Sequence, residues 1–427
     1  MRSGLLASNR NNPKRYLLLS MLLPMLLVAV GWIVLEVHPF GTRQILVTDF
    51  WHQYYPFLCI LQEKLKHGES LLYTWQSGMG SNFAAMMAYY TASPLNLLTL
   101  LVPASMLRDT VTGLVLLKIG AAGGFFAAFL KGTYGRNDSS LCLFGTMYAL
   151  CDFMMGYSWN IIWLDTVALV MLGVVRLVRT GSYHLYTVSL ALAMLANFYI
   201  GFFICIFTVI AYFCICIFTG MGFKRFLTRS GKMLAATILG LANSSILLLP
   251  TYYALQNTYS IHNTFPQHST FYETWSDLLS QLLAYQIPTV KEGKPNLYCG
   301  VLCVVLVGMF LRARSIRIRE KVGAILVLAF LLVSCNWNIL NYLWHGCHFP
   351  NMLPFALLTL AYRAYLLLLE RRMKWLDLIA MVLCSGVFLF LVYTTDRKQV
   401  VLYTGMTMLA YLLWMLLHKL GLLHRRV

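Results

Sequence analysis

One acidic residue, Asp49, opens a segment dense in side chains that can bind or transfer chemical groups. The residues that follow it include Trp51, His52, Gln53, Tyr54 and Tyr55. A carboxylate at an interface can accept the proton of a substrate hydroxyl, which is the work of a general base. Asp directly before an apolar helical repeat is also a common helix N-cap. The two interpretations are compatible, and both predict a helix that begins near Asp49.

The repeat after Asp49 predicts an amphipathic helix over residues 50–66 that lies in the membrane interface. Its apolar residues recur at helical spacing, and the polar side of the helix is expected to carry Gln62, Glu63, Lys64 and Lys66. The stretch that follows, which contains Tyr89 and Tyr90, is too irregular for a plain span. It predicts re-entrant or surface helices.

Two charged residues belong to apolar surroundings. Lys118 lies in mid-run, and about ten residues to either end is far for a lysine stem to reach water. A charge at that depth is costly and usually faces a cavity or a partner. We expect Lys118 to hold an anionic headgroup or the carboxylate of Asp152 or Asp165. Asp165 follows a tight turn, so it either ends a helix or belongs to a site.

The remaining polar candidates lie in later loops. Asn296 and Tyr298 open an apolar run after a polar loop, which is typical of a turn or of the lip of a binding site. His345 and His348 are too few ligands for a zinc site, so we expect substrate or interface contacts there and no metal. The sequence contains no nucleotide-binding loop, HExxH motif or nucleophile elbow.

The elements that position these residues must be membrane helices. The 427 residues are 59% hydrophobic and 11% charged, whereas a soluble domain carries about 25% charged residues. The net charge of +18 does not predict a nucleic-acid partner, because the basic residues sit in short groups between apolar runs. The eleven cysteines lie mostly in apolar runs and predict small hydrophobes rather than disulfides.

Apolar windows predict an all-α polytopic membrane protein in which residues 1–427 form a single embedded domain. Windows of about 20 residues predict roughly twelve transmembrane helices. They centre near 16–36, 109–130, 139–157, 161–178, 183–199, 201–220, 232–250, 298–311, 321–335, 352–369, 375–393 and 400–417. The run around Asn197 and Gly201 is ambiguous between one helix and two. The first span reads as an uncleaved anchor.

The basic residues also predict sidedness. The loops on the side of the N-terminus hold 23 of the 33 Lys and Arg residues, and the opposite side holds 8. By the positive-inside rule, both termini are cytoplasmic. The long segments 37–107, 251–297 and 336–351 then lie outside. They are rich in Tyr, Trp, His and Asn, and we expect function on that face.

Several segments, taken in order, resemble the bacterial YfhO family. The first is Asp49–Phe57, and it is quite specific. The others are Gly78–Phe83, Tyr89–Asn96, Trp163–Asp165, Asn197–Gly201, Pro295–Gly300, Trp344–Gly346 and Phe349–Asn351. Family members are usually considerably longer, and this chain lacks an aromatic–Arg stretch between Pro354 and Phe355. A shortened or degenerate member is therefore expected.

The resemblance implies a GT-C-type glycosyltransferase of the bacterial plasma membrane that uses no cofactor. Such enzymes move a sugar from a polyprenyl-phosphate donor to an outer acceptor, for instance lipoteichoic acid. Asp49 occupies the place of their catalytic acid in the first outer loop and would be the general base. Lys118 would steady the departing phosphate. The aromatic residues around Asp49 would stack on sugar faces.

Two readings from other classes stay open. A transporter or lipid flippase would also show many spans and an intramembrane lysine. Transporters often carry an internal repeat with matching broken helices, which is not evident in this sequence, and a flippase does not need a carboxylate at the root of an aromatic loop. A non-catalytic membrane scaffold is the third reading.

Overall fold

The computed structural model describes residues 14–156, 165–258, 264–285, 288, 294–344, 352–393 and 397–422. Helices form nearly all the regular structure of these ranges, and the two strands found there make one short antiparallel hairpin. The chain divides into two compact units. Each unit is described by itself.

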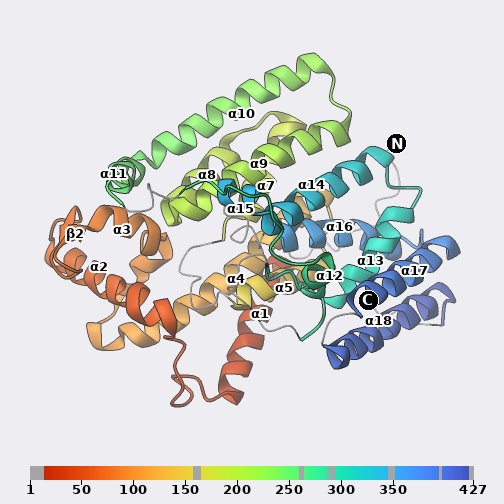
Figure 1. Cartoon of the computed structure of the whole chain (residues 1–427), viewed down its shortest axis with the longest axis horizontal. Coiled ribbons are helices and arrows are strands. Elements are labelled where there is room, and N and C mark those ends of the chain that lie inside the picture. Colours follow the sequence, from red (N-terminus) through yellow and green to blue (C-terminus); the bar gives the residue numbers. More distant parts are fainter. Residues whose placement is uncertain are drawn as a thin grey trace. The chain divides into compact units, whose positions relative to one another are not determined.

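The first unit comprises Met1–Ala149, Tyr157–Tyr212 and Gly222–Thr264. Its described elements are α1 (Arg15–Val34), the π-helix η1 (Phe50–Tyr54), α2 (Tyr55–His67), β1 (Tyr73–Thr74), β2 (Ser81–Asn82), α3 (Phe83–Tyr90), the 3-10 helices η2 (Pro94–Leu101) and η3 (Ala104–Met106), α4 (Leu107–Tyr134), α5 (Ser140–Ala149), α7 (Val167–Thr180), α8 (His184–Ala196), the start of α9 (Phe198–Thr219), α10 (Phe223–Asn243) and α11 (Ser245–Leu255). Helices α2 and α3 and the hairpin lie together at one end of this unit (Figure 1).

The second unit comprises Leu150–Gly156, Phe213–Met221 and Phe265–Val427. Its described elements are α6 (Asp152–Gly156), the end of α9, α12 (Trp275–Ser280), α13 (Val301–Arg312), α14 (Ile318–Asn336), α15 (Asn338–Trp344), α16 (Met352–Leu369), α17 (Trp375–Val392) and α18 (Lys398–Lys419).

Glycines allow the central helices of the first unit to approach closely. Helix α4 packs against α1, α5 and α7. A Cβ on Gly123 would lie 2.5 Å from the carbonyl oxygen of Ser20 in α1, and a Cβ on Gly124 would lie 2.3 Å from Met21 Cγ. Association between membrane helices relies on such small residues, because lipid provides no hydrophobic drive between them. The same device recurs in the second unit, where Gly308 of α13 faces the backbone of α17.

The expected all-α membrane protein is confirmed, whereas the twelve predicted spans are not confirmed. Among the described residues, six helices are long and apolar enough to cross a membrane, namely α1, η3–α4, α9, α16, α17 and α18. A seventh span results if α10 and α11, which meet at a 77° bend (Figure 1), count as one. Helices α5, α8 and α13 are apolar but shorter.

The ambiguous run near Asn197 is two helices. Helix α8 ends at Ala196, and Asn197 adopts an extended conformation before α9 begins at Phe198. The Asn197 side-chain oxygen accepts a hydrogen bond from the Ile200 N–H at 2.9 Å and so satisfies a donor in the first turn of α9.

Candidate functional site

Asp49 is exposed at the start of a π-helix. The prediction that it caps this helix is wrong: its backbone is already helical (φ −61°, ψ −24°), and its side chain accepts no bond from the first-turn N–H groups. The π-helix η1 runs from Phe50 to Tyr54 and continues into α2. Short π-helical turns occur frequently at functional sites. The Asp49 carboxylate therefore does not act as a helix cap.

Two tyrosines from α3 reach the same turn of helix. The Tyr90 hydroxyl donates to Gln53 Oε1 at 2.8 Å, and Gln53 Nε2 lies 3.5 Å from Asp49 Oδ1. The Tyr90 ring packs edge-on against Tyr54, with centroids 4.9 Å apart. Tyr89 lies beside Tyr90 at 4.7 Å and hydrogen-bonds to Tyr54. The structure thus brings Asp49, Gln53, Tyr54, Tyr89 and Tyr90 together.

Both α3 hydroxyls keep their protons at neutral pH. Burial raises the pKa of Tyr90 to about 12, with further contributions from Tyr89 and from the Asp49 charge. Burial first, and then Asp49, raises the pKa of Tyr89. Protonated phenols donate hydrogen bonds, so these groups can hold acceptor oxygens of a bound molecule.

The first residues of α9 also belong to this cluster. The sequence analysis did not identify them as site residues. Asn197 Nδ2 donates to the Tyr89 carbonyl oxygen at 2.6 Å. The rings of Phe198 and Tyr199 lie 6.1 Å and 5.8 Å from the Tyr89 ring. The signal was present in the segment Asn197–Gly201, where an asparagine interrupts two apolar runs. We name Asp49, Gln53, Tyr54, Tyr89, Tyr90 and Tyr199 the Asp49 cluster.

Trp51, Tyr55 and His52 are not part of this packing. Trp51 and Tyr55 stack on each other with an interplanar angle of 5° and centroids 6.3 Å apart. Trp51 is 53% exposed. His52 is exposed, and no hydrogen bond links it to another described residue. These three side chains are available to ligand or lipid.

The polar side expected for the helix over residues 50–66 is partly buried, which corrects that prediction. Gln62 donates to the carbonyl oxygens of Thr99 and Val102 at 2.6 and 3.0 Å. Lys64 is also buried. Helix α2 therefore does not present one solvated face, because its polar residues tie down the segments that follow it.

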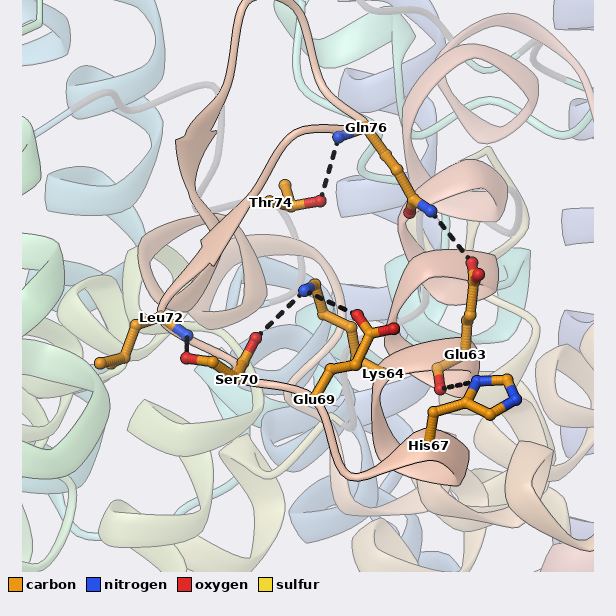
Figure 2. A network of polar contacts seen from close by, with 8 residues as sticks. All are labelled: Glu63, Lys64, His67, Glu69, Ser70, Leu72, Thr74 and Gln76. Atoms are coloured by element: carbon orange, nitrogen blue, oxygen red, sulfur yellow. Dashed lines mark hydrogen bonds and ion pairs between the residues drawn. The ribbon is translucent and has the colours of Figure 1, made fainter.

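The hairpin β1–β2 is fastened to α2 by the network in Figure 2. Lys64 Nζ contacts Glu69 Oε2 at 3.3 Å and the Ser70 carbonyl at 3.1 Å, while Gln76 Nε2 donates to Glu63 Oε2 at 3.1 Å. These contacts order the chain that leads from α2 into α3. They therefore position the two α3 tyrosines against Asp49.

Lys118 is 1% exposed, and its partner is an amide rather than a carboxylate. Its Nζ donates to Asn96 Oδ1 at 2.9 Å. Asn96 Nδ2 in turn donates to the Thr91 carbonyl at 3.0 Å. Lys118 therefore links α4 to the segment directly after Tyr89 and Tyr90. Among the described residues, no hydrogen bond links Lys118 to Asp49.

Asp165 has a structural role, but it lies before the start of α7, where the sequence reading expected the end of a helix. Its Oδ2 accepts from the Tyr148 hydroxyl at 2.7 Å, and its Oδ1 accepts from the Val167 N–H at 3.0 Å at the start of α7. The carboxylate is 3% exposed and is satisfied by α5 and α7. The prediction that it pairs with Lys118 is wrong.

Asn296 and Tyr298 belong to the second unit. Asn296 is buried, and the Tyr298 carbonyl accepts from the Asp152 N–H at 2.7 Å. Asp152 Oδ2 is buried and has no hydrogen-bond partner among the described residues. His345 and His348 lie outside the described residues. Among the residues that are described, no group of three or more His, Cys, Asp or Glu side chains is arranged to hold a metal.

Residues 20–426 match the family described as bacterial membrane protein YfhO. The chain belongs to the YfhO family. This match covers nearly the whole chain and confirms the resemblance carried by the segments above. No curated protein matches it. Three of those YfhO-like segments, Asp49–Phe57, Tyr89–Asn96 and Asn197–Gly201, meet in the Asp49 cluster although more than a hundred residues separate the first from the last.

Proposed function

We propose that this YfhO-family protein is a membrane glycosyltransferase with Asp49 as its general base. The observation that carries the proposal is the Asp49 cluster: an exposed carboxylate, without a capping role, beside protonated tyrosine hydroxyls and aromatic faces. Family membership is consistent with a glycosyltransferase-like role. The donor would be a polyprenyl-phosphate sugar and the acceptor a cell-envelope polymer such as lipoteichoic acid.

In the proposed reaction, Asp49 takes the proton from an acceptor hydroxyl. The acceptor oxygen forms a bond to the anomeric carbon of the sugar, and the bond from that carbon to the phosphate oxygen breaks. The polyprenyl phosphate leaves with the electron pair. A base within hydrogen-bond reach of the hydroxyl contributes about 10²–10⁴-fold to the rate of such a step.

Gln53 and the tyrosines would orient the reacting groups. Gln53 is held at Oε1 by Tyr90, which leaves its Nε2 directed toward Asp49. The faces of Tyr89 and Tyr199 offer stacking surfaces, and Trp51, His52 and Tyr55 are candidates for further substrate contact. Lys118 stays a candidate for the phosphate, since two of its three N–H donors have no described acceptor.

We also propose substrate contacts from residues later in the chain. The candidates for contact with the acceptor are Asn296, Tyr298, His345 and His348. Asp165 would act only indirectly, by fixing α5 to α7. The charge asymmetry of the loops supports cytoplasmic termini, which would put Asp49 on the outer face.

The test is sugar transfer by Asp49→Asn in membranes supplied with a labelled polyprenyl-phosphate sugar. We expect a loss of about 10²-fold or more in the rate of transfer, with normal insertion. Glu36→Gln is the matched control, because it removes one exposed carboxylate that lies directly before the outer segment 37–107. Undiminished transfer by Asp49→Asn would remove Asp49 as the base. Movement of labelled lipid across vesicles by the wild-type protein, without glycosylated product, would favour a flippase.

A further inference from the structure

A second polar cluster, outside the Asp49 cluster, joins the segment that follows α1 to the first turn of α4. His38 Nε2 is paired with Asp109 Oδ1, and Arg108 Nη2 lies 3.3 Å from the same ring nitrogen. One imidazole nitrogen cannot donate to Asp109 and accept from Arg108 at once. When Nε2 carries the proton toward Asp109, the guanidinium has no acceptor there.

The positive charge of Arg108 is therefore not neutralised by a carboxylate of the cluster. Asp109 is engaged by His38, and no ion pair links Arg108 to another described residue. The Arg108 side chain is exposed. Its charge lowers the pKa of Tyr55, although burial is the largest influence and raises it. Arg108 thus lies near the Tyr55 hydroxyl, and Tyr55 stacks on Trp51.

The cluster lies beside the ends of two helices that are long and apolar enough to cross a membrane. Helix α1 ends at Val34 and α4 begins at Leu107, and these helices pack along each other. The surrounding surface is apolar, with Val34 75%, Phe40 51% and Met106 50% exposed. Exposed Trp51 adds an aromatic side chain of the kind that marks the membrane–water boundary. A guanidinium at that boundary matches the geometry of a phosphate group, which it can bind through two N–H donors.

We propose that Arg108, with His38 held by Asp109, binds the phosphate of a membrane lipid beside Trp51 and Tyr55. The phosphate takes the guanidinium donors that His38 leaves unpaired. The lipid is either the polyprenyl phosphate of the proposed reaction or a bilayer phospholipid, and only the first identity rests on the proposed function. Asp49 directly precedes η1 and Trp51 is the second residue of that helix, so a donor held here would reach the base.

The test measures lipid binding to the purified full-length chain in detergent micelles. The probes are polyprenyl phosphate, phosphatidylglycerol and, as a probe without phosphate, polyprenol. For Arg108→Gln we expect about tenfold weaker binding of a phosphate lipid, since a charged hydrogen bond is lost, and unchanged binding of polyprenol. Arg108→Lys should recover part of the affinity. Arg43→Gln is the matched control: it removes another exposed arginine, from the outer segment 37–107, and its binding should stay within about twofold of the wild type.

Each outcome decides a point. Loss for polyprenyl phosphate alone identifies the donor, and loss for phosphatidylglycerol alone identifies a structural phospholipid. Equal loss in Arg43→Gln reduces the effect to general charge and overturns the site, as does unchanged binding by Arg108→Gln. Loss in Lys118→Met but not in Arg108→Gln moves the phosphate to Lys118. Because binding is measured without turnover, Asp49→Asn should bind the lipid normally. If Asp49→Asn did not abolish sugar transfer, the proposed base would be wrong but the proposed phosphate site would be unaffected.

Discussion

The pair formed by Lys118 and Asn96 offers a quantitative test of how a buried cation is held in this fold. Lys118 is 1% exposed and Asn96 is fully buried, and the Nζ–Oδ1 distance is 2.9 Å. We consider Lys118→Met, Asn96→Leu and the double variant. Methionine resembles the lysine stem in shape and removes the charge.

The three variants should not be additive. Lys118→Met loses a charged hydrogen bond, about 1.5–3 kcal/mol, but also removes the desolvation cost of a buried ammonium. Asn96→Leu strands that ammonium, which costs about 3–5 kcal/mol, and frees the Thr91 carbonyl. In the double variant only the Thr91 carbonyl is left unpaired, at about 1–3 kcal/mol. We therefore expect Asn96→Leu alone to be the least stable, and a coupling of about 2 kcal/mol.

The measurement is the free energy of unfolding in mixed micelles of a mild detergent and dodecyl sulfate. Hydrogen bonds between membrane helices average about 0.6 kcal/mol and reach about 1.7 kcal/mol. A coupling above that range supports a charged Lys118 that depends on Asn96. Free energies that add within about 0.5 kcal/mol would refute the reasoning, because the two side chains would then be independent.

Two further predictions concern neighbouring residues. Burial raises the pKa of Tyr90 from 10.0 to about 12, so its contribution to stability is full below pH 10 and is lost as the pH rises to about 12. In a series of thermal unfolding measurements across this pH range, Tyr90→Phe should lose less stability than the wild type. An unchanged profile would contradict this prediction. Asp165→Ala should lower the free energy of unfolding by about 2 kcal/mol or more, since it removes the carboxylate that accepts from the Tyr148 hydroxyl and the Val167 N–H. Asp165→Asn keeps an acceptor and should cost less, so equal losses would argue against this account.

The membrane character of the protein followed from the sequence because it depends on composition and on runs of about 20 apolar residues. Nearly all the predicted windows coincide with helices, from α1 at the start to α18 at the end. The number of helices that cross the whole membrane could not be read from the sequence in the same way. An apolar window does not reveal a break such as the 77° bend after α10 or the short length of α5 and α8.

The candidate site was predictable in its kinds of residue and not in its pairings. The segment after Asp49 and the tyrosines of α3 stood out by type. The bond from Tyr90 to Gln53 and the contacts of Asn197 and Tyr199 with Tyr89 join residues far apart in the chain. Periodicity reports only on neighbours within one helix, so it has no access to such contacts.

Charged residues show the division most clearly. The sequence alone determined that Lys118 lies deep in an apolar helix and that Asp49 precedes an aromatic segment. Only the tertiary structure decided that Lys118 donates a hydrogen bond to Asn96 and that Asp49 does not cap a helix. It also decided that the Asp165 carboxylate accepts hydrogen bonds from Tyr148 and Val167. The physical reason is that a buried polar group needs a partner, and which partner it finds depends on the packing of whole helices.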